Sequence, residues 1–142
     1  MSSVKKPSKL YIAVGRLDNE TAYSVIIVDS RLAVIDMWSD YIGRASELEA
    51  YLIGLINGLR RAFELKYTSL EVFVSSNEVV DILNNKCKSV SSNLRDLCME
   101  VIKFVKKFGK VDVRYIEIEE NNRAFSLACK ALDIKGRYPP IL

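Results

Sequence analysis

Few side chains in this sequence are suited to covalent or metal chemistry. The chain has no histidine, which removes the commonest general base and the commonest transition-metal ligand. Its three cysteines, Cys87, Cys98 and Cys129, are odd in number and form no CxxC spacing, so neither a disulfide framework nor a zinc site is indicated. We therefore expect three reduced thiols, as in a cytosolic protein, and no cofactor.

Basic side chains form a second group, because they can contact phosphate. Lys86 and Lys88 lie in a polar stretch, residues 84–92, and Arg60 and Arg61 are adjacent in a helical pattern. Lysine and arginine contacts to phosphate supply much of the affinity of non-specific nucleic-acid binding. The net charge of +3 permits such binding without requiring it. Solvated lysines in a polar loop would explain the same residues.

Length and composition predict one folded domain. The 142 residues are 49% hydrophobic and 27% charged, which is ordinary for a globular protein. We divide the chain into a basic leader (residues 1–9), a domain (10–133) and a tail (134–142). No apolar stretch is long enough to span a bilayer, so we expect a cytoplasmic protein; no membrane contact or small-molecule substrate is indicated. The absence of glutamine and histidine suggests a thermophilic source.

Hydrophobic periodicity predicts the element order βββαβααβα. Strands are expected at residues 10–15, 22–29, 32–38, 70–74 and 111–118, and the Asp29-Ser30-Arg31 junction predicts a hairpin. A long amphipathic helix begins at Ser46, which forms a capping box with Glu49. Three further helices are expected: residues 77–83, the segment whose apolar face includes Leu94 and Val101, and residues 120–132. Three antiparallel strands followed by helix-linked parallel strands predict an α/β domain with a mixed five-stranded sheet and helices packed on it.

Short motifs follow these elements in a recognisable order. They are Gly58-Leu59 with Ala62-Phe63-Glu64-Leu65, Leu70-Glu71-Val72 leading to Ser76 and Val79-Val80, Asn84, Phe108-Gly109, and Glu119-Glu120-Asn121 leading to Ala124, Leu127 and Ala128. In order and spacing these motifs resemble type 1 ribonuclease H in its archaeal or bacterial short form. The resemblance covers roughly residues 10–132 and implies a ribonuclease H-like fold.

The resemblance also locates the residues that catalysis would need. Enzymes of this family hold two divalent metal ions on four carboxylates, and here the four positions carry Ala13, Tyr51, Ser75 and Phe125. None of these side chains can replace a carboxylate as a bridge between metals. The loop after the first strand, which approaches the RNA in active members, is shortened to residues 16–21. The resemblance therefore implies a catalytically inactive relative, with no metal bound.

Other polar residues near these positions allow two further expectations. Glu47, one helical turn before Tyr51, together with Asp18 and Glu119, would have to converge from displaced positions to rebuild a one-metal site. Asn121 matches a family asparagine, and beside Phe125 we expect it to cap the last helix.

Two functions from different classes follow. The first is binding of RNA or an RNA/DNA hybrid without cleavage, with Lys86, Lys88, Arg60 and Arg61 as contacts, since family members place basic residues in the loop after the short helix. The second is a protein-interaction or scaffolding subunit of a nucleic-acid-processing assembly. Its partner contacts would be Tyr51 and Phe125, which we otherwise expect to pack over Ala13. An active ribonuclease H with relocated metal ligands is a third reading. A continuous basic stripe would favour the first function and an apolar patch the second.

Overall fold

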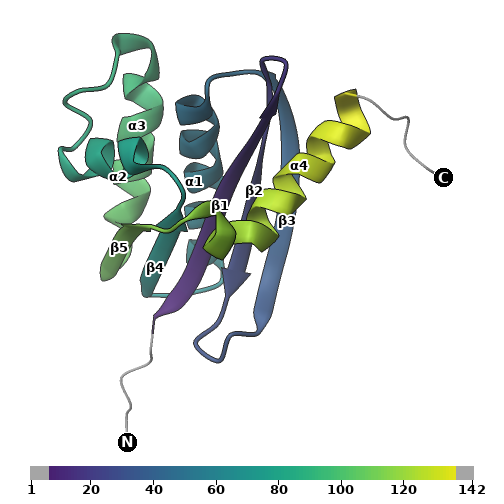
Figure 1. Ribbon diagram of the computed structural model, residues 1–142. Helices are drawn as coiled ribbons and strands as arrows, with labels where there is room; N and C mark the ends of the chain where they lie inside the picture. Colours follow the sequence, from purple (N-terminus) through teal and green to yellow (C-terminus); the bar gives the residue numbers. More distant parts are fainter. Residues whose placement is uncertain (1–6, 137–142) are drawn as a thin grey trace, which may run out of the picture.

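The computed structural model describes residues 7–136, and the side chains of residues 7–133. Its elements follow the predicted order, with one short 3-10 helix added before the last helix (Figure 1). They are β1 (Ser8–Leu17), β2 (Glu20–Val28), β3 (Val34–Arg44), α1 (Glu47–Glu64), β4 (Ser69–Val74), α2 (Asn77–Asn84), α3 (Ser92–Val105), β5 (Lys110–Tyr115), η1 (Ile118–Asn121) and α4 (Asn122–Gly136).

The five strands form one mixed sheet in the order β3-β2-β1-β4-β5. β1 pairs antiparallel with β2, and β2 with β3, whereas β1 with β4 and β4 with β5 are parallel. This topology confirms the predicted α/β fold class. Among the described residues, none of the helices has both the length and the apolar character that crossing a bilayer requires.

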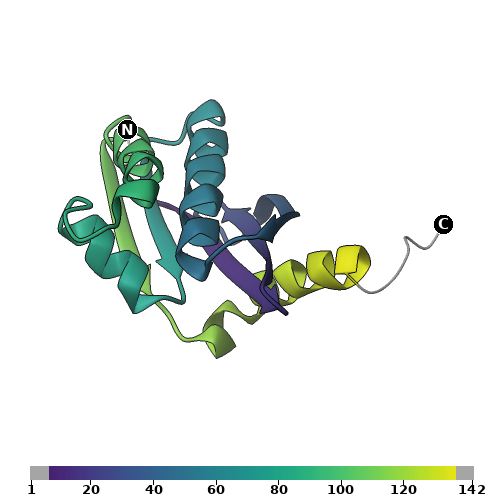
Figure 2. The ribbon, with the colours of Figure 1, turned by 90° about the horizontal axis from the view of Figure 1, so that it is seen from above.

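The helices cover the two faces of the sheet unequally. Figure 2 shows α1, α2 and α3 on one side of the sheet and α4 on the other. The larger core lies under α1, where Leu55 and Leu59 pack with Leu10 and Ile12 of β1. Gly58 permits this close approach, because a Cβ there would lie 3.1 Å from a methyl group of Leu10. A smaller core lies under α4 and contains Ala13, Ile26, Val28 and Ala124.

Serine side chains cap the N-termini of α1 and α2. The Glu49 amide donates to the hydroxyl oxygen of Ser46 at 3.0 Å, so the predicted N-cap of α1 is confirmed. The Val79 amide donates likewise to the Ser76 hydroxyl oxygen at 3.2 Å. These hydrogen bonds define where α1 and α2 begin.

The second and third strands differ from the prediction at their connection. Leu32 was expected to begin a strand, but it lies in the turn with φ of 69° and is 65% exposed, and β3 begins only at Val34. The cause is Asp29, whose carboxylate oxygen accepts the amides of Arg31 and Ala33 at 2.8 and 2.9 Å. This local hydrogen bonding overrides the apolar pattern.

The ends of the domain differ from the expected division. β1 begins at Ser8, so the last two residues of the expected leader belong to the sheet, and α4 continues to Gly136, into the expected tail. Residues 1–6 and 137–142, which include the rest of the leader and of the tail, lie outside the described residues. β5 ends at Tyr115 rather than at residue 118, because residues 118–121 form η1.

The expectation of three reduced thiols is wrong for two of the cysteines. Cys87 and Cys98 form a disulfide whose Cα atoms are 6.0 Å apart. Both residues are buried, at 2% and 0% exposure, and the bond joins the α2–α3 connection to α3. Cys129 is the free cysteine of the described residues.

Candidate functional site

The four positions that the resemblance assigns to metal ligands meet in one hollow. Ala13 of β1, Tyr51 of α1, Ser75 after β4 and Phe125 of α4 line a pocket with a volume of about 190 Å³, which we call the Ala13 pocket. The remaining lining residues are Val14, Arg16, Glu47 and Ile118.

The sheet topology explains this convergence. Ile12 pairs with Val74 in the parallel β1–β4 ladder, so Ala13 and Ser75 follow at the same level of two neighbouring strands. Tyr51 belongs to the first turns of α1 and Phe125 to the first turns of α4. The pocket is therefore built at the carboxyl end of β4 by elements that close from both faces of the sheet.

Tyr51 is a buried lining residue of the pocket. Its side chain is buried, with 3% exposure, and burial is the main reason that its pKa rises to about 12; a backbone hydrogen bond with Ser75 lowers the pKa, and the Glu47 charge raises it. The phenol is thus neutral at physiological pH. Burial also removes Tyr51 from the expected partner contacts, whereas Phe125 is half-buried and packs on the smaller core.

Asn121 ties the α4 side of the pocket to the sheet. Its Nδ2 atom donates to the carbonyl oxygen of Ile12 at 2.9 Å and to the hydroxyl oxygen of Ser75 at 3.2 Å. The side chain is 2% exposed, and its Oδ1 atom has no hydrogen-bond partner. The expected capping role is wrong, because the Asn121 side chain is used to join η1 to β1 and to the end of β4.

The donor atoms of the Ala13 pocket do not fit two divalent metal ions. Glu47 is its one carboxylate among the lining residues, and Asp18 and Glu119 do not line it. Within residues 7–133, no three acidic or cysteine side chains are grouped so that they could hold a metal ion. The displaced acids therefore do not converge on a metal site.

Lys86 and Lys88 are exposed in the α2–α3 connection. The eight-residue helix α2 separates this connection from Ser75, which at 1.5 Å per residue is about 12 Å. Lys86 and Cys87 both have positive φ, 58° and 70°, a conformation that non-glycine residues seldom adopt. The bond from Cys87 to Cys98 holds this segment on α3.

The two arginines grouped with these lysines have local partners instead. The Arg60 guanidinium lies over the ring of Phe104, 5.5 Å from its centre. Arg61 is paired with Asp36 at 2.9 Å and with Glu64 at 3.4 Å, and the Asp36 hydrogen bond is the main reason that the Arg61 pKa is raised. Much of the Arg61 charge is thus neutralised within the protein.

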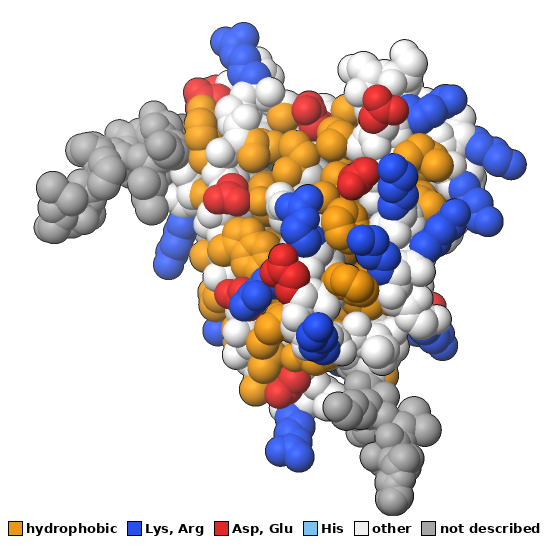
Figure 3. Space-filling model, turned by 180° about the vertical axis from the view of Figure 1, so that it is seen from behind, with side chains coloured by type: hydrophobic (Ala, Val, Ile, Leu, Met, Phe, Trp, Pro, Cys, Tyr) orange, Lys and Arg blue, Asp and Glu red, His pale blue; other side chains and the backbone are white. Residues whose placement is uncertain are grey.

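Arg16 is a basic residue of the pocket that the sequence did not single out. It lines the Ala13 pocket, and its guanidinium donates to the Ala45 carbonyl oxygen at 3.3 Å. The available signal was its position three residues after Ala13; the expected loop at residues 16–21 is instead mostly strand, because β1 continues to Leu17 and Arg16 pairs with Thr21 of β2. Figure 3 shows the face formed by α1 and α3, where basic side chains gather toward one side but alternate with apolar and acidic ones. On this face neither a continuous basic stripe nor a purely apolar patch is present.

Comparison with known proteins bears on this geometry. A family model described as reverse transcriptase-like matches residues 13–131. The RNase H1 of the halophilic archaeon Halobacterium salinarum NRC-1 is similar in structure, with a TM-score of 0.83 and 22% identity over 90% of this chain and 98% of that chain. The N-terminal RNase H domain of a Mycobacterium tuberculosis protein gives 0.80 and 25% over 88% and 94%.

A third similar structure contains nucleic acid. LC11-RNase H1, solved in complex with an RNA/DNA hybrid, gives a TM-score of 0.81 and 21% identity over 89% of this chain and 96% of that chain. A sequence search of the curated proteins gave no match. The structural matches show that the fold is ribonuclease H-like.

Proposed function

We propose that this chain, which belongs to the reverse transcriptase-like family and has a ribonuclease H-like fold, binds RNA or an RNA/DNA hybrid without cleaving it. The observation that carries the proposal is the composition of the Ala13 pocket, where Ala13, Tyr51, Ser75 and Phe125 meet and none of the four is acidic. The fold supports a nucleic-acid surface, and the pocket lacks the groups for hydrolysis.

The chemistry of phosphodiester cleavage explains why we expect no hydrolysis. Two metal ions activate the attacking water and stabilise the leaving oxygen, and each needs anionic oxygen ligands. Glu47 is a single exposed carboxylate at the pocket. The buried phenol of Tyr51 and the ring of Phe125 supply no anionic ligand, so a metal ion would lose hydration without gaining equivalent ligands.

Support for binding comes from the basic residues beside the pocket and from a relative. Lys86 and Lys88 are exposed about one short helix away from Ser75, and Arg16 stands at the pocket itself. The similar LC11-RNase H1 was solved with an RNA/DNA hybrid. Charge reversal at both lysines should weaken binding, because lysine contacts to phosphate release counterions.

The test measures binding and cleavage of one labelled RNA/DNA hybrid. We expect weak, sequence-independent binding that decreases steeply with salt, and no cleavage with magnesium or manganese. The Lys86→Glu/Lys88→Glu variant should bind less tightly, whereas Lys103→Glu/Lys106→Glu, with the same change in net charge at the end of α3, should bind like the wild type. Absence of binding at low salt would contradict the proposal, and equal binding by both variants would remove the loop from the site.

Three controls test the loss of catalysis separately. A ligand that binds only the folded state raises the melting temperature. Because we expect no magnesium to bind, millimolar magnesium should leave the melting temperature unchanged. Magnesium-dependent hydrolysis that disappears in Glu47→Gln would show instead that displaced acids serve as ligands. A variant with Ala13→Asp, Tyr51→Glu, Ser75→Asp and Phe125→Asp provides the comparison in which a magnesium-dependent stabilisation is expected.

A protein-interaction role is the second candidate. Ile118 is 45% exposed and lines the Ala13 pocket together with half-buried Phe125, and exposed apolar side chains of this kind occur in the cores of protein interfaces. A partner captured from the source organism should be lost by Ile118→Asp but retained by Met99→Asp, a similarly exposed residue on α3. Equal retention by both variants would count against this role.

The disulfide bears on two further expectations, a cytoplasmic location and a thermophilic source. A cytoplasmic protein normally keeps its thiols reduced, but intracellular proteins of hyperthermophiles are an exception. A thermophilic source would therefore reconcile the Cys87–Cys98 bond with a cytoplasmic location. A melting temperature in the ordinary mesophilic range, about 45–65 °C, would contradict this explanation.

A further inference from the structure

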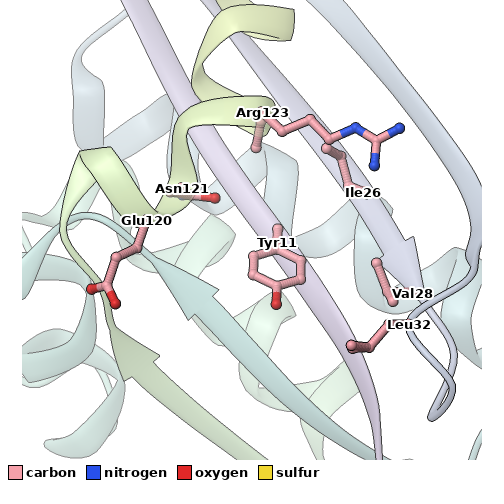
Figure 4. A pocket seen from close by; sticks show the side chains of 8 residues that line it. Tyr11, Ile26, Val28, Leu32, Glu120, Asn121 and Arg123 are labelled. Carbon is pink, nitrogen blue, oxygen red and sulfur yellow. The ribbon is translucent and has the colours of Figure 1, made fainter.

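A second pocket lies on the other side of the η1–α4 junction from the Ala13 pocket. It has a volume of about 250 Å³ and is lined by Tyr11, Ile26, Val28, Leu32, Glu120, Asn121, Arg123 and Ala124. Figure 4 shows Tyr11 at its centre, with Ile26, Val28 and Leu32 to one side and Glu120 and Asn121 to the other. We call it the Tyr11 pocket.

The centre of the Tyr11 pocket is one end of an aromatic stack. The rings of Tyr11 and Phe73, on the neighbouring strands β1 and β4, have centroids 5.1 Å apart and planes inclined by 21°. Lys9 lies over the Phe73 ring, 6.0 Å from its centre. The Tyr11 ring also lines the pocket, whose other walls include residues of β2 and α4, and it packs against the smaller core. A planar group in the pocket would extend the stack.

Another wall of the pocket is formed by Leu32, an exposed leucine in the β2–β3 turn. Leu32 is 65% exposed and has a φ of 69°, a conformation that costs free energy in a non-glycine residue. The Asp29 hydrogen bonds to Arg31 and Ala33 hold the turn in this shape. As a result, an apolar side chain stands at the rim of the pocket, where it can cover an apolar ligand.

Polar groups surround the apolar centre. Arg123 is exposed, extends from α4 along the edge of the pocket toward Ile26 in Figure 4, and forms no ion pair with the described residues. The unpartnered, buried Oδ1 atom of Asn121 belongs to a residue that lines the same pocket. The pocket thus combines an aromatic ring, apolar walls, a cation without an ion-pair partner among the described residues, and a nearby hydrogen-bond acceptor.

We propose that the Tyr11 pocket binds one unpaired nucleobase of a single-stranded nucleic acid, with the base stacked on Tyr11 and the flanking phosphate contacted by Arg123. Single-strand binding sites combine these same elements, since aromatic rings take the bases and basic side chains follow the backbone. An apolar side chain of a protein partner would fill the walls equally well, but it would leave Arg123 without an anion. The site is distinct from the Ala13 pocket and does not require that the chain binds a hybrid duplex.

The test uses the full chain and labelled single-stranded oligonucleotides of mixed sequence, about 12 nucleotides long, as RNA and as DNA. Fluorescence anisotropy should show binding by the wild type, and Tyr11→Leu, which keeps apolar bulk but removes the ring, should weaken it by roughly five- to a hundredfold. Tyr11→Phe should bind nearly as the wild type. Arg123→Ala should reduce the affinity and the slope against salt, while Lys130→Ala, at an exposed position of the same helix, should not.

The outcomes separate this site from the hybrid-binding proposal. Loss of single-strand binding in Tyr11→Leu, with duplex binding still sensitive to Lys86→Glu/Lys88→Glu, would establish two surfaces. Unchanged single-strand binding in Tyr11→Leu, or none by the wild type at low salt, would overturn the nucleobase assignment. The nucleobase assignment would also be overturned if Tyr11→Leu abolished binding of a protein partner but left RNA binding unchanged. A preference for RNA over DNA would show a contact to the 2′-hydroxyl, and equal affinity would assign recognition to base and phosphate alone.

Discussion

Asn121 and Ile12 are joined by a buried hydrogen bond, in which the amide Nδ2 atom donates to the main-chain oxygen of β1 at 2.9 Å. This bond fixes the junction between the two pockets to the central strand. Asn121→Ala would leave the Ile12 carbonyl without this donor inside the protein, and we expect a loss of about 1–3 kcal/mol in the free energy of unfolding. Chemical denaturation measures it. The neighbouring Asn122→Ala, at an exposed position, should change stability little; equal effects of both variants would contradict the role of this bond.

Phe125→Asp tests whether the aromatic ring closes the Ala13 pocket. Phe125 is half-buried and packs on a core that includes Ala13 and Ala124, so the variant removes apolar contact and places a carboxylate beside apolar groups. We expect a loss of about 1–3 kcal/mol, seen as a lower melting temperature. Ser126→Asp adds the same charge to the same turn of α4 at an exposed position and should not lower it. An unchanged melting temperature for Phe125→Asp would make this ring a candidate partner contact.

The disulfide predicts how many thiols can be titrated. Denatured, unreduced protein should show one free thiol, that of Cys129, because Cys87 and Cys98 are bonded to each other. Three titrated thiols would show that the bond is absent from the isolated protein.

Breaking the disulfide should destabilise the fold. The bond spans 11 positions of sequence, and a loop of that size corresponds to about 3 kcal/mol in the chain-entropy model. Denaturation of Cys87→Ser/Cys98→Ser should give a loss of that order, and Cys129→Ser should serve as the control. The double variant should also bind hybrid less tightly if the bond orients Lys86 and Lys88.

Tyr51 predicts a loss of stability at alkaline pH. Burial raises its pKa to about 12 in the folded state, above the ordinary value near 10, so the unfolded chain releases this proton first. The contribution is complete below about pH 10 and is lost as the pH rises toward 12, with a slope of up to about 1.4 kcal/mol per pH unit. Denaturation at several pH values should give a shallower slope for Tyr51→Phe. Part of the slope should persist, because burial and a hydrogen bond to Asp40 also raise the pKa of Tyr23 to about 12. An identical slope in the variant would contradict the assignment.

The topology could be predicted from short-range sequence signals, namely helix caps and hydrophobic periodicity. Ser46 and Ser76 begin helices as their types suggest, and the strand and helix periods determine which segments can be parallel. The family resemblance supplied the four positions that line the Ala13 pocket, because motif spacing carries over where topology is shared.

The features that were missed depend on contacts between distant or unusual positions. Cys87 meets Cys98 because the chain turns through left-handed conformations at Lys86 and Cys87, and no glycine marks that turn. Asn121 reaches the main chain of β1 across more than a hundred positions of sequence, which a capping rule based on neighbours cannot anticipate. Leu32 belongs to an apolar run, and only the Asp29 hydrogen bonds place it in a turn.

The pairing of β1 has a consequence for the order of folding. On one side β1 meets β2, its neighbour in sequence, and this hairpin closes a short loop. On the other side residues 8–12 pair with residues 70–74 of β4. This pairing closes a long loop that contains all of β2, β3 and α1. Closing a long loop costs more chain entropy, and contacts of this kind slow folding. The hairpin strands should therefore acquire protection from hydrogen exchange before β4 does, and docking of β4 should limit the folding rate.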